Sequence, residues 1–328
     1  MADNPIRLGL VGLGAHMVDN LLHRLMTLPV EIAAVCDILP ERISFVERKY
    51  RTGAAYTDYK RMLERESLDA VICSATPQIH YEVAKSSMLA DLPVFVEKTP
   101  CRTVEQAEEL AALQQSTGRY AMVGFNRRFA TAYLMAKEVA QRAKFGGIHM
   151  YQAKYHAGAY GSKHAFIFNH IVNHMDLARF LLGELAVTHA EAFELDDRRF
   201  GYNITLMAES GAIGNIQSAS VQDMTFPVER VELIGSGQNV IVDNLKSIVH
   251  NRPGQWNGGG MRAAFREQGD AQSWNVNNGL HTSFTYLGYD LELLEFVQSA
   301  AKRREPAVHM GDTVKTIRLM EQVRRLLQ

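Results

Sequence analysis

The sequence predicts an α/β protein with a parallel, doubly wound sheet in its N-terminal part, followed by an α+β region with a large, mostly antiparallel, open-faced sheet. Short apolar runs alternate with amphipathic stretches over residues 1–125, which is the rhythm of βαβ units. After Phe125, two helical patterns are followed by a series of strand-like runs. A length of 328 residues exceeds that of a usual single domain, so we expect two domains, 1–125 and 126–328.

Five apolar runs predict the strands of the first domain. They are Ile6–Val11, Val30–Cys36, Ala70–Ala75, Val94–Val96 and Tyr120–Val123. The stretches between them predict helices, two of which have recognisable ends. Pro93 disfavours helical geometry in the residue before it and so ends one helix, whereas Thr103 with Gln106 resembles the capping box that begins the next.

The second domain is predicted to contain both helices and strands. The helices cover about 129–142 and 170–182, and the strands cover 148–155, 202–208, 228–234 and 240–242. Residues 251–279 are rich in Gly, Asn and Gln and predict a long loop, and two final helices at about 289–301 and 313–327 can pack back on the first domain. Helices on one face of such a sheet leave its other face uncovered, which predicts a homodimer or homotetramer through that face.

The composition favours a small, weakly charged partner. Lysine and arginine total 35 against 36 aspartates and glutamates, so no net field attracts nucleic acid or an anionic membrane. The first apolar run is too short for a signal peptide or a membrane span, which predicts a cytoplasmic protein. Cys36, Cys73 and Cys101 are widely spaced and predict neither a disulfide framework nor a zinc site.

A glycine-rich segment follows the first predicted strand and begins the first helix. Gly12 permits a tight turn, and Gly14 lets the backbone approach a pyrophosphate, whose charge the free amides at a helix N-terminus favour. Ala15, His16 and Met17 follow at the start of the helix and are included among the cofactor-binding candidates. Met17 departs from the dinucleotide-binding pattern, because glycine or alanine normally stands there to allow close packing of helix and strand.

Asp37 ends the second predicted strand, about 25 residues after Gly12, in the region where a carboxylate accepts hydrogen bonds from the adenosine ribose. Such a carboxylate also repels a 2′-phosphate. We therefore predict NAD as the cofactor and NADP as the weaker alternative, for which the nearby Arg42 is the feature in favour. The competing interpretation is an ordinary α/β turn with a surface aspartate.

Three further segments carry a resemblance to a known family. They are Thr76-Pro77-Gln78-Ile79-His80, Glu97-Lys98-Thr99-Pro100 and Gly124-Phe125-Asn126-Arg127-Arg128-Phe129. All follow predicted strands, at whose carboxyl ends open α/β sheets bind their ligands. Together with the glycine segment, they make nearly the whole chain resemble the Gfo/Idh/MocA oxidoreductases, which include glucose-fructose oxidoreductase and inositol dehydrogenase. The resemblance implies a Rossmann dinucleotide-binding domain and a small sugar-like or polyol substrate.

The resemblance also implies three catalytic candidates, Lys98, His174 and His170. The lysine of the family's Glu-Lys-Pro motif lies beside the nicotinamide and the reacting hydroxyl, and it corresponds to Lys98, although Thr99 here separates it from the proline. The family's Asp-x-x-x-His-x-x-Asp helix corresponds to a segment that ends at Asp176. His174 stands at the catalytic histidine and His170 replaces the upstream aspartate, one helical turn away on the same face.

In a dehydrogenase of this kind, His174 would take the hydroxyl proton as hydride leaves, because imidazole titrates near neutral pH, and Lys98 would hold and polarise the oxygen. A second imidazole at position 170 cannot stabilise the imidazolium by charge, as a carboxylate would. The simpler interpretations are a solvated Lys-Glu pair at residues 97 and 98 and a packed structural histidine pair. His-x-x-x-His is also a metal-ligand spacing, but no third ligand is identifiable, so no metal is predicted.

The site candidates fall into three groups. The catalytic candidates are Lys98, His170 and His174. The cofactor-binding candidates are Gly12, Gly14, Ala15, His16, Met17, Asp37, Arg42, Thr76, Pro77, His80, Glu97, Lys98 and Asn126. The substrate-binding candidates are Lys98, Asn126, Tyr155, His156, His170 and His174. Trp274 and Asn277, in the predicted loop, could fold over the substrate. Aromatic and amide groups suit sugar faces and hydroxyls, although aromatic residues on strands are more often part of the core.

Three functions remain open from the sequence. The leading one is an NAD(H)-dependent oxidoreductase that moves hydride to or from a secondary alcohol of a sugar, sugar acid or cyclitol. The second keeps the cofactor but is redox-neutral, as in a lyase, glycosidase or epimerase that oxidises its sugar transiently. The third is a non-catalytic protein that senses a dinucleotide or a sugar, since a fold alone does not determine function.

Overall fold

The computed structural model describes residues 5–223, 225, 228–253, 270–276 and 284–328. The chain divides into two compact units. The first comprises residues 1–126 and 289–318, and the second comprises residues 127–288 and 319–328. No helix in the described part of the chain combines the length and the apolar character that crossing a membrane requires.

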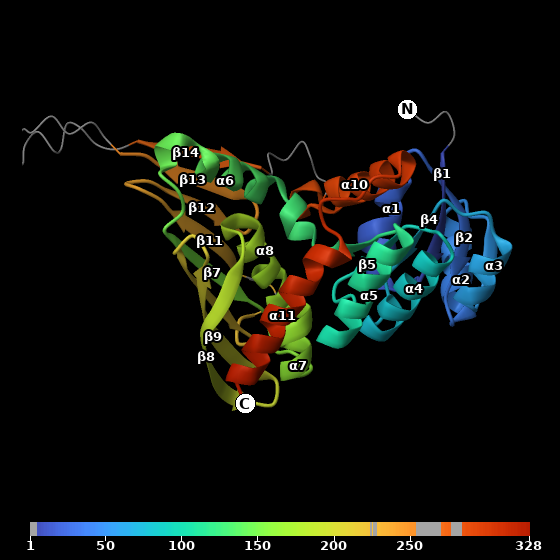
Figure 1. Cartoon of the computed structure of the whole chain (residues 1–328), viewed down its shortest axis with the longest axis horizontal. Helices are drawn as coiled ribbons and strands as arrows, with labels where there is room; N and C mark the ends of the chain where they lie inside the picture. Colours follow the sequence, from blue (N-terminus) through green and yellow to red (C-terminus); the bar gives the residue numbers. More distant parts are fainter. Residues whose placement is uncertain (1–4, 224, 226–227, 254–269, 277–283) are drawn as a thin grey trace, which may run out of the picture. The chain divides into compact units, whose positions relative to one another are not determined.

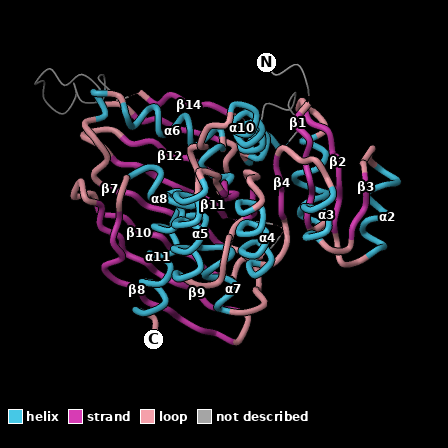
Figure 2. The backbone as a smooth tube through the Cα atoms, turned by 45° about the vertical axis from the view of Figure 1, so that its right-hand side comes forward, coloured by secondary structure: helices cyan, strands magenta, loops and turns pink. Residues whose placement is uncertain are grey.

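The first unit contains a six-stranded parallel sheet with the strand order β3-β2-β1-β4-β5-β6. Figure 1 labels β5 and Figure 2 labels β1 to β4 of this sheet. The strands are β1 (Ile6–Val11), β2 (Val30–Cys36), β3 (Ala54–Tyr56), β4 (Ala70–Cys73), β5 (Val94–Glu97) and β6 (Ala121–Gly124). All five predicted strands are confirmed, with ends that differ by at most two residues. β3 was not predicted, because three residues that are half-buried or exposed form no apolar run.

Helices connect the strands of this sheet. They are a π-helical turn (Met17–Leu22) continued by α1 (His23–Leu25), α2 (Pro40–Lys49), α3 (Tyr59–Arg65), α4 (Pro77–Leu89) and α5 (Val104–Thr117). The predicted cap of α5 is confirmed, because the Thr103 hydroxyl accepts a hydrogen bond from the backbone N–H of Gln106 at 3.3 Å. α10 (Tyr289–Lys302) also belongs to this unit, and α11 (Met310–Leu326) contributes residues to both units.

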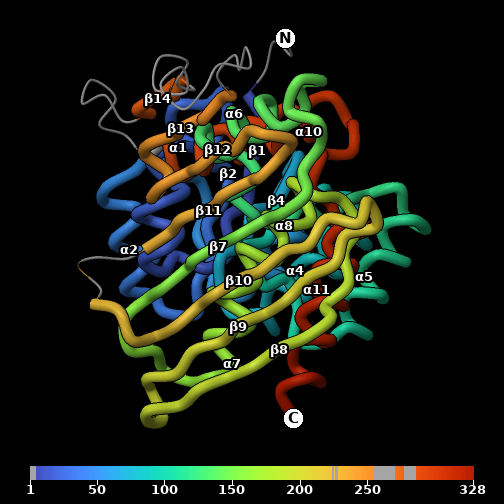
Figure 3. The backbone as a smooth tube through the Cα atoms, turned by 90° about the vertical axis from the view of Figure 1, so that its left-hand side faces the viewer, coloured from blue at the N-terminus to red at the C-terminus, as the bar shows by residue number. Residues whose placement is uncertain are grey.

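The second unit contains an eight-stranded sheet with the order β14-β13-β12-β11-β7-β10-β9-β8, which Figure 3 shows in front of its helices. The strands are β7 (Met150–His156), β8 (Leu185–Asp196), β9 (Arg199–Ala208), β10 (Ile213–Ala219), β11 (Val228–Ile234), β12 (Asn239–Asp243), β13 (Ser247–Asn251) and β14 (Ala271–Asn275). Neighbouring strands pair antiparallel except β7 and β10, which are parallel. The predicted fold class is therefore confirmed.

Two predictions in this unit need correction. The loop prediction over 251–279 is wrong at Ala271–Asn275, which pairs with β13 as β14; the backbone hydrogen bonds of that ladder do not require an apolar sequence pattern. Trp274 lies on this strand, whereas Asn277 falls outside the described residues. The helix expected from His170 begins earlier, with α7 (Lys163–Phe166) and a π-helical turn (Ile167–Ile171) before α8 (Val172–Leu182).

The sheet of the second unit is buried on one face. α6 (Thr131–Gln141) packs against β12 and β13, and α8 packs against β7 and β10, on the same side of the sheet in Figure 1. Buried residues alternate with partly exposed ones along β11, β12 and β13, as expected for a sheet covered on one face. On the other face, Met150, Ile213 and Met207 are register neighbours and all are exposed.

Candidate functional site

The glycine turn after β1 has the geometry of a phosphate cradle. Gly12 has a φ angle of 80°, and a Cβ atom there would lie 2.3 Å from the carbonyl oxygen of Ser74, so only glycine fits. At Gly14 a Cβ would meet no atom closer than Arg42 Nη1 at 4.0 Å. The backbone at Gly14 is therefore open to a close-approaching anionic group, next to the start of the helical segment.

The side chain of Met17, the residue that departs from the glycine pattern, is fully buried. This residue begins the π-helical turn Met17–Leu22, which is wider than an α-helical turn. The larger residue at the third position of the glycine pattern thus coincides with a local widening of the helix.

Asp37, at the carboxyl end of β2, is tied to the glycine turn. One carboxylate oxygen accepts a hydrogen bond from the backbone N–H of Leu13 at 2.7 Å, and the other accepts one from Leu39 N–H at 3.0 Å. Arg42 Nη1 lies 3.4 Å from the same carboxylate. The Asp37 side chain is buried, so in this structure it orders the turn as well as marking the position expected for a ribose contact.

The other candidates of the first unit lie at the same edge of the sheet, since the carboxyl ends of parallel strands meet there. Thr76 and Pro77 begin α4 directly after β4, Glu97 ends β5 and is followed by Lys98, and Asn126 follows β6. The structure therefore brings these candidates and the glycine turn to one edge. The Lys98–Thr99 peptide bond is cis.

His80 connects two of these segments. Its Nε2 accepts a hydrogen bond from Ala75 N–H at 2.8 Å, so Nδ1 carries the hydrogen and donates to the carbonyl oxygen of Thr99 at 2.9 Å. Burial lowers the pKa of His80, against the opposing effect of the Thr99 hydrogen bond. His80 is therefore a buried neutral bridge between the segments after β4 and β5.

Glu97 is buried and contacts His16. His16 Nε2 lies 3.0 Å from a Glu97 carboxylate oxygen, and the ring of Tyr289 meets the His16 ring edge-on at 5.6 Å. Burial opposes ionisation of Glu97, but the contact with His16 and the charge of Lys98 together lower its pKa. A carboxylate therefore lies beside both His16 and Lys98 at the carboxyl edge of the sheet.

In the second unit, three substrate-binding candidates line one cavity of about 830 Å³. Tyr155 and His156 end β7, and His170 lies on the facing helical segment. Arg127 and Glu229 also contribute to the cavity wall. This volume is in the range of small-molecule sites.

His170 is held by Tyr155 in two ways. The two rings stack with centroids 3.7 Å apart and planes 3° from parallel, and His170 Nε2 lies 3.1 Å from the backbone carbonyl oxygen of Tyr155. Burial lowers the pKa of His170 to about 3. The ring is therefore neutral at physiological pH.

His174 is fully buried one helical turn further on. Its Nε2 lies 3.3 Å from Glu229 Oε1, and the Tyr155 ring lies over it at a centroid distance of 4.2 Å. Both ring nitrogens are buried, and within the part of the chain that the structure describes neither has a hydrogen bond of regular geometry, so the Glu229 contact is a close approach of charge. Burial lowers the pKa of His174, and the Glu229 carboxylate opposes this shift only in part.

Glu229 was not among the predicted site residues. Arg127 donates to both of its carboxylate oxygens at 3.0 and 2.8 Å, and the Tyr133 hydroxyl donates to Oε1 at 2.9 Å. Its place in the sequence held a usable indication, because Glu229 alternates with Val231 and Leu233, the inward-facing residues of β11. A carboxylate on the buried face of a strand needs such partners.

Asp176, the last residue of the histidine segment, is fully buried and pairs with Arg128. Both carboxylate oxygens accept hydrogen bonds from the Arg128 guanidinium, each at 2.6 Å. This bidentate ion pair joins α8 to the Asn126–Phe129 turn. Within the described residues, no three His, Cys, Asp or Glu side chains gather closely enough to hold a metal ion.

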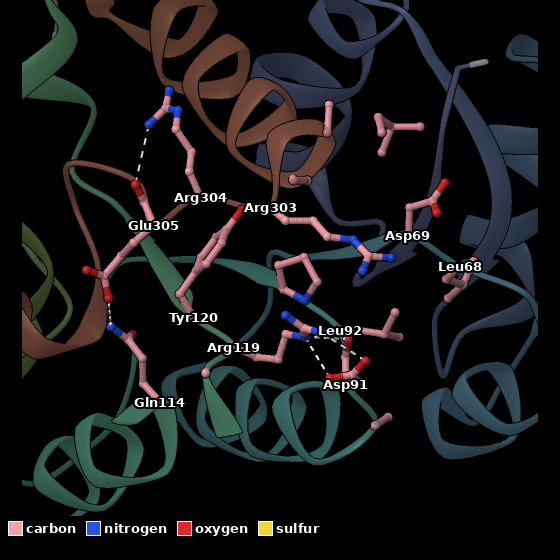
Figure 4. Close-up of a pocket in the computed structure, with 16 residues that line it drawn as sticks. Leu68, Asp69, Asp91, Leu92, Gln114, Arg119, Tyr120, Arg303, Arg304 and Glu305 are labelled. Carbon is pink, nitrogen blue, oxygen red and sulfur yellow. Dashed lines mark hydrogen bonds and ion pairs between the residues drawn. The ribbon is translucent and has the colours of Figure 1, made fainter. Parts of the chain in front are cut away.

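A second cavity, of about 480 Å³, lies in the first unit at the opposite edge of the sheet, where β1, β5 and β6 begin (Figure 4). Several of its polar side chains pair with one another: Arg119 donates to both oxygens of Asp91 at 2.7 and 3.0 Å, and Gln114 donates to Glu305. None of the cofactor-binding candidates, all of which the structure describes, lines this cavity. It is separate from the glycine turn.

The first unit is thus a Rossmann dinucleotide-binding domain in its strand order and in its glycine turn. Residues 6–125 match the model of the GFO_IDH_MocA family, described as an oxidoreductase family with an NAD-binding Rossmann fold. The predicted resemblance is confirmed over this segment, which matches the NAD-binding Rossmann fold of the Gfo/Idh/MocA oxidoreductase family.

Individual relatives agree with this assignment. Inositol 2-dehydrogenase of Salmonella paratyphi B is 27% identical over 186 residues, which are 55% of this chain and 55% of that protein, so the chain spans about half the length of this relative. A dehydrogenase structure from Chromobacterium violaceum is 24% identical and superposes with a TM-score of 0.88 over 99% of this chain and 96% of that one. An Agrobacterium radiobacter oxidoreductase, solved with NAD⁺, L-tartaric acid and magnesium, is 17% identical with a TM-score of 0.83, over 98% and 96% of the two chains. At these identities the two structures show a common fold.

Proposed function

We propose that the protein is an NAD(H)-dependent oxidoreductase that transfers hydride to or from a secondary alcohol of a sugar, sugar acid or cyclitol. The observation that carries the proposal is the open glycine turn within the segment that matches the NAD-binding family model. The inositol 2-dehydrogenase relative supports a cyclic polyol or a similar sugar as the substrate.

The residues at the carboxyl edge of the first sheet fit a dinucleotide. The backbone from Gly14 to Met17 would hold the pyrophosphate, Asp37 would accept hydrogen bonds from the adenosine ribose, and NAD would supply the hydride acceptor. The Asp37 carboxylate would repel a 2′-phosphate, which favours NAD over NADP, while Arg42 at 3.4 Å reduces that repulsion. Thr76, Pro77, His80, Glu97 and Asn126 would shape the remaining edge of the dinucleotide site.

Lys98 and His174 would carry the chemistry. The Lys98 ammonium would hold and polarise the substrate oxygen, and His174 would exchange the hydroxyl proton. His170, Tyr155 and His156 would bind the substrate as walls of the 830 Å³ cavity. Because His170 is neutral and engaged with Tyr155, we assign it a binding role and no charge in the reaction.

The proposal is tested by incubating the full chain with NAD and a panel of sugars, sugar acids and cyclitols while following the absorbance of reduced cofactor. We expect reduction of NAD with at least one substrate, and its loss in Lys98→Met and His174→Asn. Product formation without net NAD reduction would instead identify a redox-neutral enzyme. NAD binding with no turnover, unchanged in Lys98→Met, would identify a sensing protein.

The uncovered face of the second sheet supports a homodimer or homotetramer. Met150, Met207 and Ile213 form an exposed apolar row across three paired strands. Light scattering at working concentration should give a multiple of the 36.8 kDa chain mass, and Met207→Lys should reduce it. A monomeric mass for the unaltered chain would contradict this part of the proposal.

A further inference from the structure

Position 170 carries a histidine and so supplies no carboxylate to His174. The structure shows how this histidine is held. The carbonyl oxygen of Tyr155 can only accept a hydrogen bond, so His170 Nε2 at 3.1 Å carries a hydrogen and donates it. The Ser218 hydroxyl donates to the same carbonyl oxygen. His170 is thereby fixed in one tautomer, stacked on Tyr155, and it offers His174 no negative charge.

The negative charge next to His174 comes from another element. Glu229 Oε1, on β11, lies 3.3 Å from His174 Nε2 on α8, and both side chains are buried. We infer that Glu229 is the positioning residue for His174: it orients the imidazole and fixes which ring nitrogen accepts the substrate proton. The inference rests on the proposed function, in which His174 exchanges a proton with the substrate.

The contact selects a tautomer. An ionised carboxylate only accepts hydrogen bonds, so the neutral ring of His174 is most stable with its hydrogen on Nε2, directed at Glu229. Nδ1 then keeps its lone pair; both ring nitrogens are buried, and among the described residues only Nε2 has the Glu229 carboxylate beside it, at 3.3 Å. When Nδ1 takes up a proton, the positive charge of the ring forms beside Glu229 and is stabilised by it.

Glu229 is itself firmly held in the ionised form. Burial alone would raise its pKa, but the charge of Arg127 and the contact with His174 lower it well below the ordinary range. The Tyr133 hydroxyl donates to the carboxylate, and the backbone N–H of Glu229 donates to Asn244 Oδ1. The titratable and charged groups that surround the Glu229–His174 pair are Arg127, Tyr133, Tyr151, Tyr155 and His170.

The first test compares Glu229→Gln with Glu232→Gln, which removes a carboxylate from the same strand at a position that is not fully buried. We expect Glu229→Gln to lower kcat/KM by roughly 100-fold, within the range that a positioned acid-base group contributes. We also expect the acid limb of its pH profile to move about one unit lower, because the nearby carboxylate raises the pKa of His174. Glu232→Gln should match the unaltered enzyme. A Glu229→Gln variant with the kcat/KM and pH profile of Glu232→Gln would overturn the inference.

Two further variants separate positioning from stability. Glu229→Gln removes the Glu229 carboxylate from its ion pair with Arg127. The double variant Arg127→Gln/Glu229→Gln removes both charges of that pair and should fold better while remaining slow. Adding His170→Asp to Glu229→Gln places a carboxylate one helical turn from His174 and should restore at least about tenfold of the lost kcat/KM. The variant Arg127→Gln/Glu229→Gln has no carboxylate beside His174. If its kcat/KM recovered, the inference would be contradicted, because poor folding alone would then explain the loss in Glu229→Gln.

A spectroscopic measurement decides the inference even if no substrate is turned over, in which case only the proposed function fails. The ¹⁵N chemical shifts of His174, assigned with a His174→Gln variant, should show the Nε2–H tautomer in the unaltered chain. In the double variant Arg127→Gln/Glu229→Gln that preference should be reduced. A His174 ring with its hydrogen on Nδ1 in the unaltered chain would overturn the inference.

Discussion

The two units hold their candidate site residues by different physical means. In the first unit, the glycine turn depends on backbone geometry: a left-handed φ at Gly12, an open backbone at Gly14, and amides ordered by the Asp37 carboxylate. In the second unit, the histidines are held by side chains, through a buried Arg127–Glu229 ion pair and ring stacking on Tyr155. A backbone site tolerates most changes of side chain except at its glycines, whereas a side-chain network is sensitive to charge and pH at each member.

The largest effect is expected at the backbone site. Gly12→Ala places a Cβ atom 2.3 Å from Ser74 O and strains the positive φ, which should displace the turn and lower NAD affinity by about 100-fold, since each lost charge-assisted hydrogen bond is worth roughly 1.5–3 kcal/mol. Isothermal titration with NAD measures this. Gly118→Ala is the matched control, because Gly118 has a φ of 65° but no atom within 4 Å of its would-be Cβ. Equal losses in the two variants would show that strain, and not the close approach to Ser74, is responsible.

The next largest effect is expected at His80, whose two ring nitrogens both contact backbone groups. His80→Phe removes the hydrogen bonds of the ring to Ala75 N–H and Thr99 C=O, which should lower the free energy of unfolding by roughly 2–4 kcal/mol. Urea unfolding measures it, and His23→Phe, at an exposed histidine of the same unit, serves as the control. An unchanged unfolding free energy would show that the bridge contributes nothing to stability.

The pH dependence of stability tests the side-chain network. The pKa of His170 is about 3 in the folded chain and near 6.5 when unfolded, so below pH 6.5 only the unfolded chain takes up this proton and stability falls. His170→Phe, which preserves an aromatic ring against Tyr155, should remove a loss of about 1.4 kcal/mol per pH unit between pH 6.5 and 4. Urea unfolding at pH 7 and pH 5 measures it, with His164→Phe, at an exposed histidine of α7, as the control. Parallel pH profiles for His170→Phe and the unaltered chain would contradict a buried, neutral His170.

The smallest effect is expected at Asp37, whose side chain accepts a hydrogen bond from the backbone of the glycine turn. Asp37→Asn removes the charge that disfavours a 2′-phosphate while leaving Arg42 in place, so the ratio of NADP to NAD affinity should rise by roughly tenfold. Titrations with both dinucleotides measure it. Glu41→Gln, on the exposed side of α2, should leave the ratio unchanged. A ratio that does not change in Asp37→Asn would show that Asp37 orders the turn without selecting the cofactor.

Local patterns predicted most of the fold. The apolar runs of the first unit became β1, β2, β4, β5 and β6 because buried parallel strands require continuous apolar sequence. β3, β8, β13 and β14 were not predicted. β3 is short and not fully buried, and β8 and β14 are mostly exposed, so these three strands leave no periodic apolar pattern. β13 is five residues long and has only two aliphatic side chains, Ile248 and Val249.

Local sequence patterns predicted the candidate site only in part. Residues next to one another in the chain, such as the glycine turn or the pair His170 and His174, follow from spacing and helical period. The bridging role of His80 does not follow from spacing, because its acceptor, the carbonyl oxygen of Thr99, lies after a different strand. Asp37 was predicted as a ribose contact, and its hydrogen bond to Leu13 adds a structural role that spacing does not reveal.

By itself, the sequence determined the two sheets, the glycine turn and the helix that carries the histidines, because each depends on the period or conformation of neighbouring residues. Only the tertiary structure decided which charge lies beside His174. That charge belongs to Glu229 on a strand distant in the chain, and the low dielectric of the interior makes the contact strong only once folding has removed water from both groups.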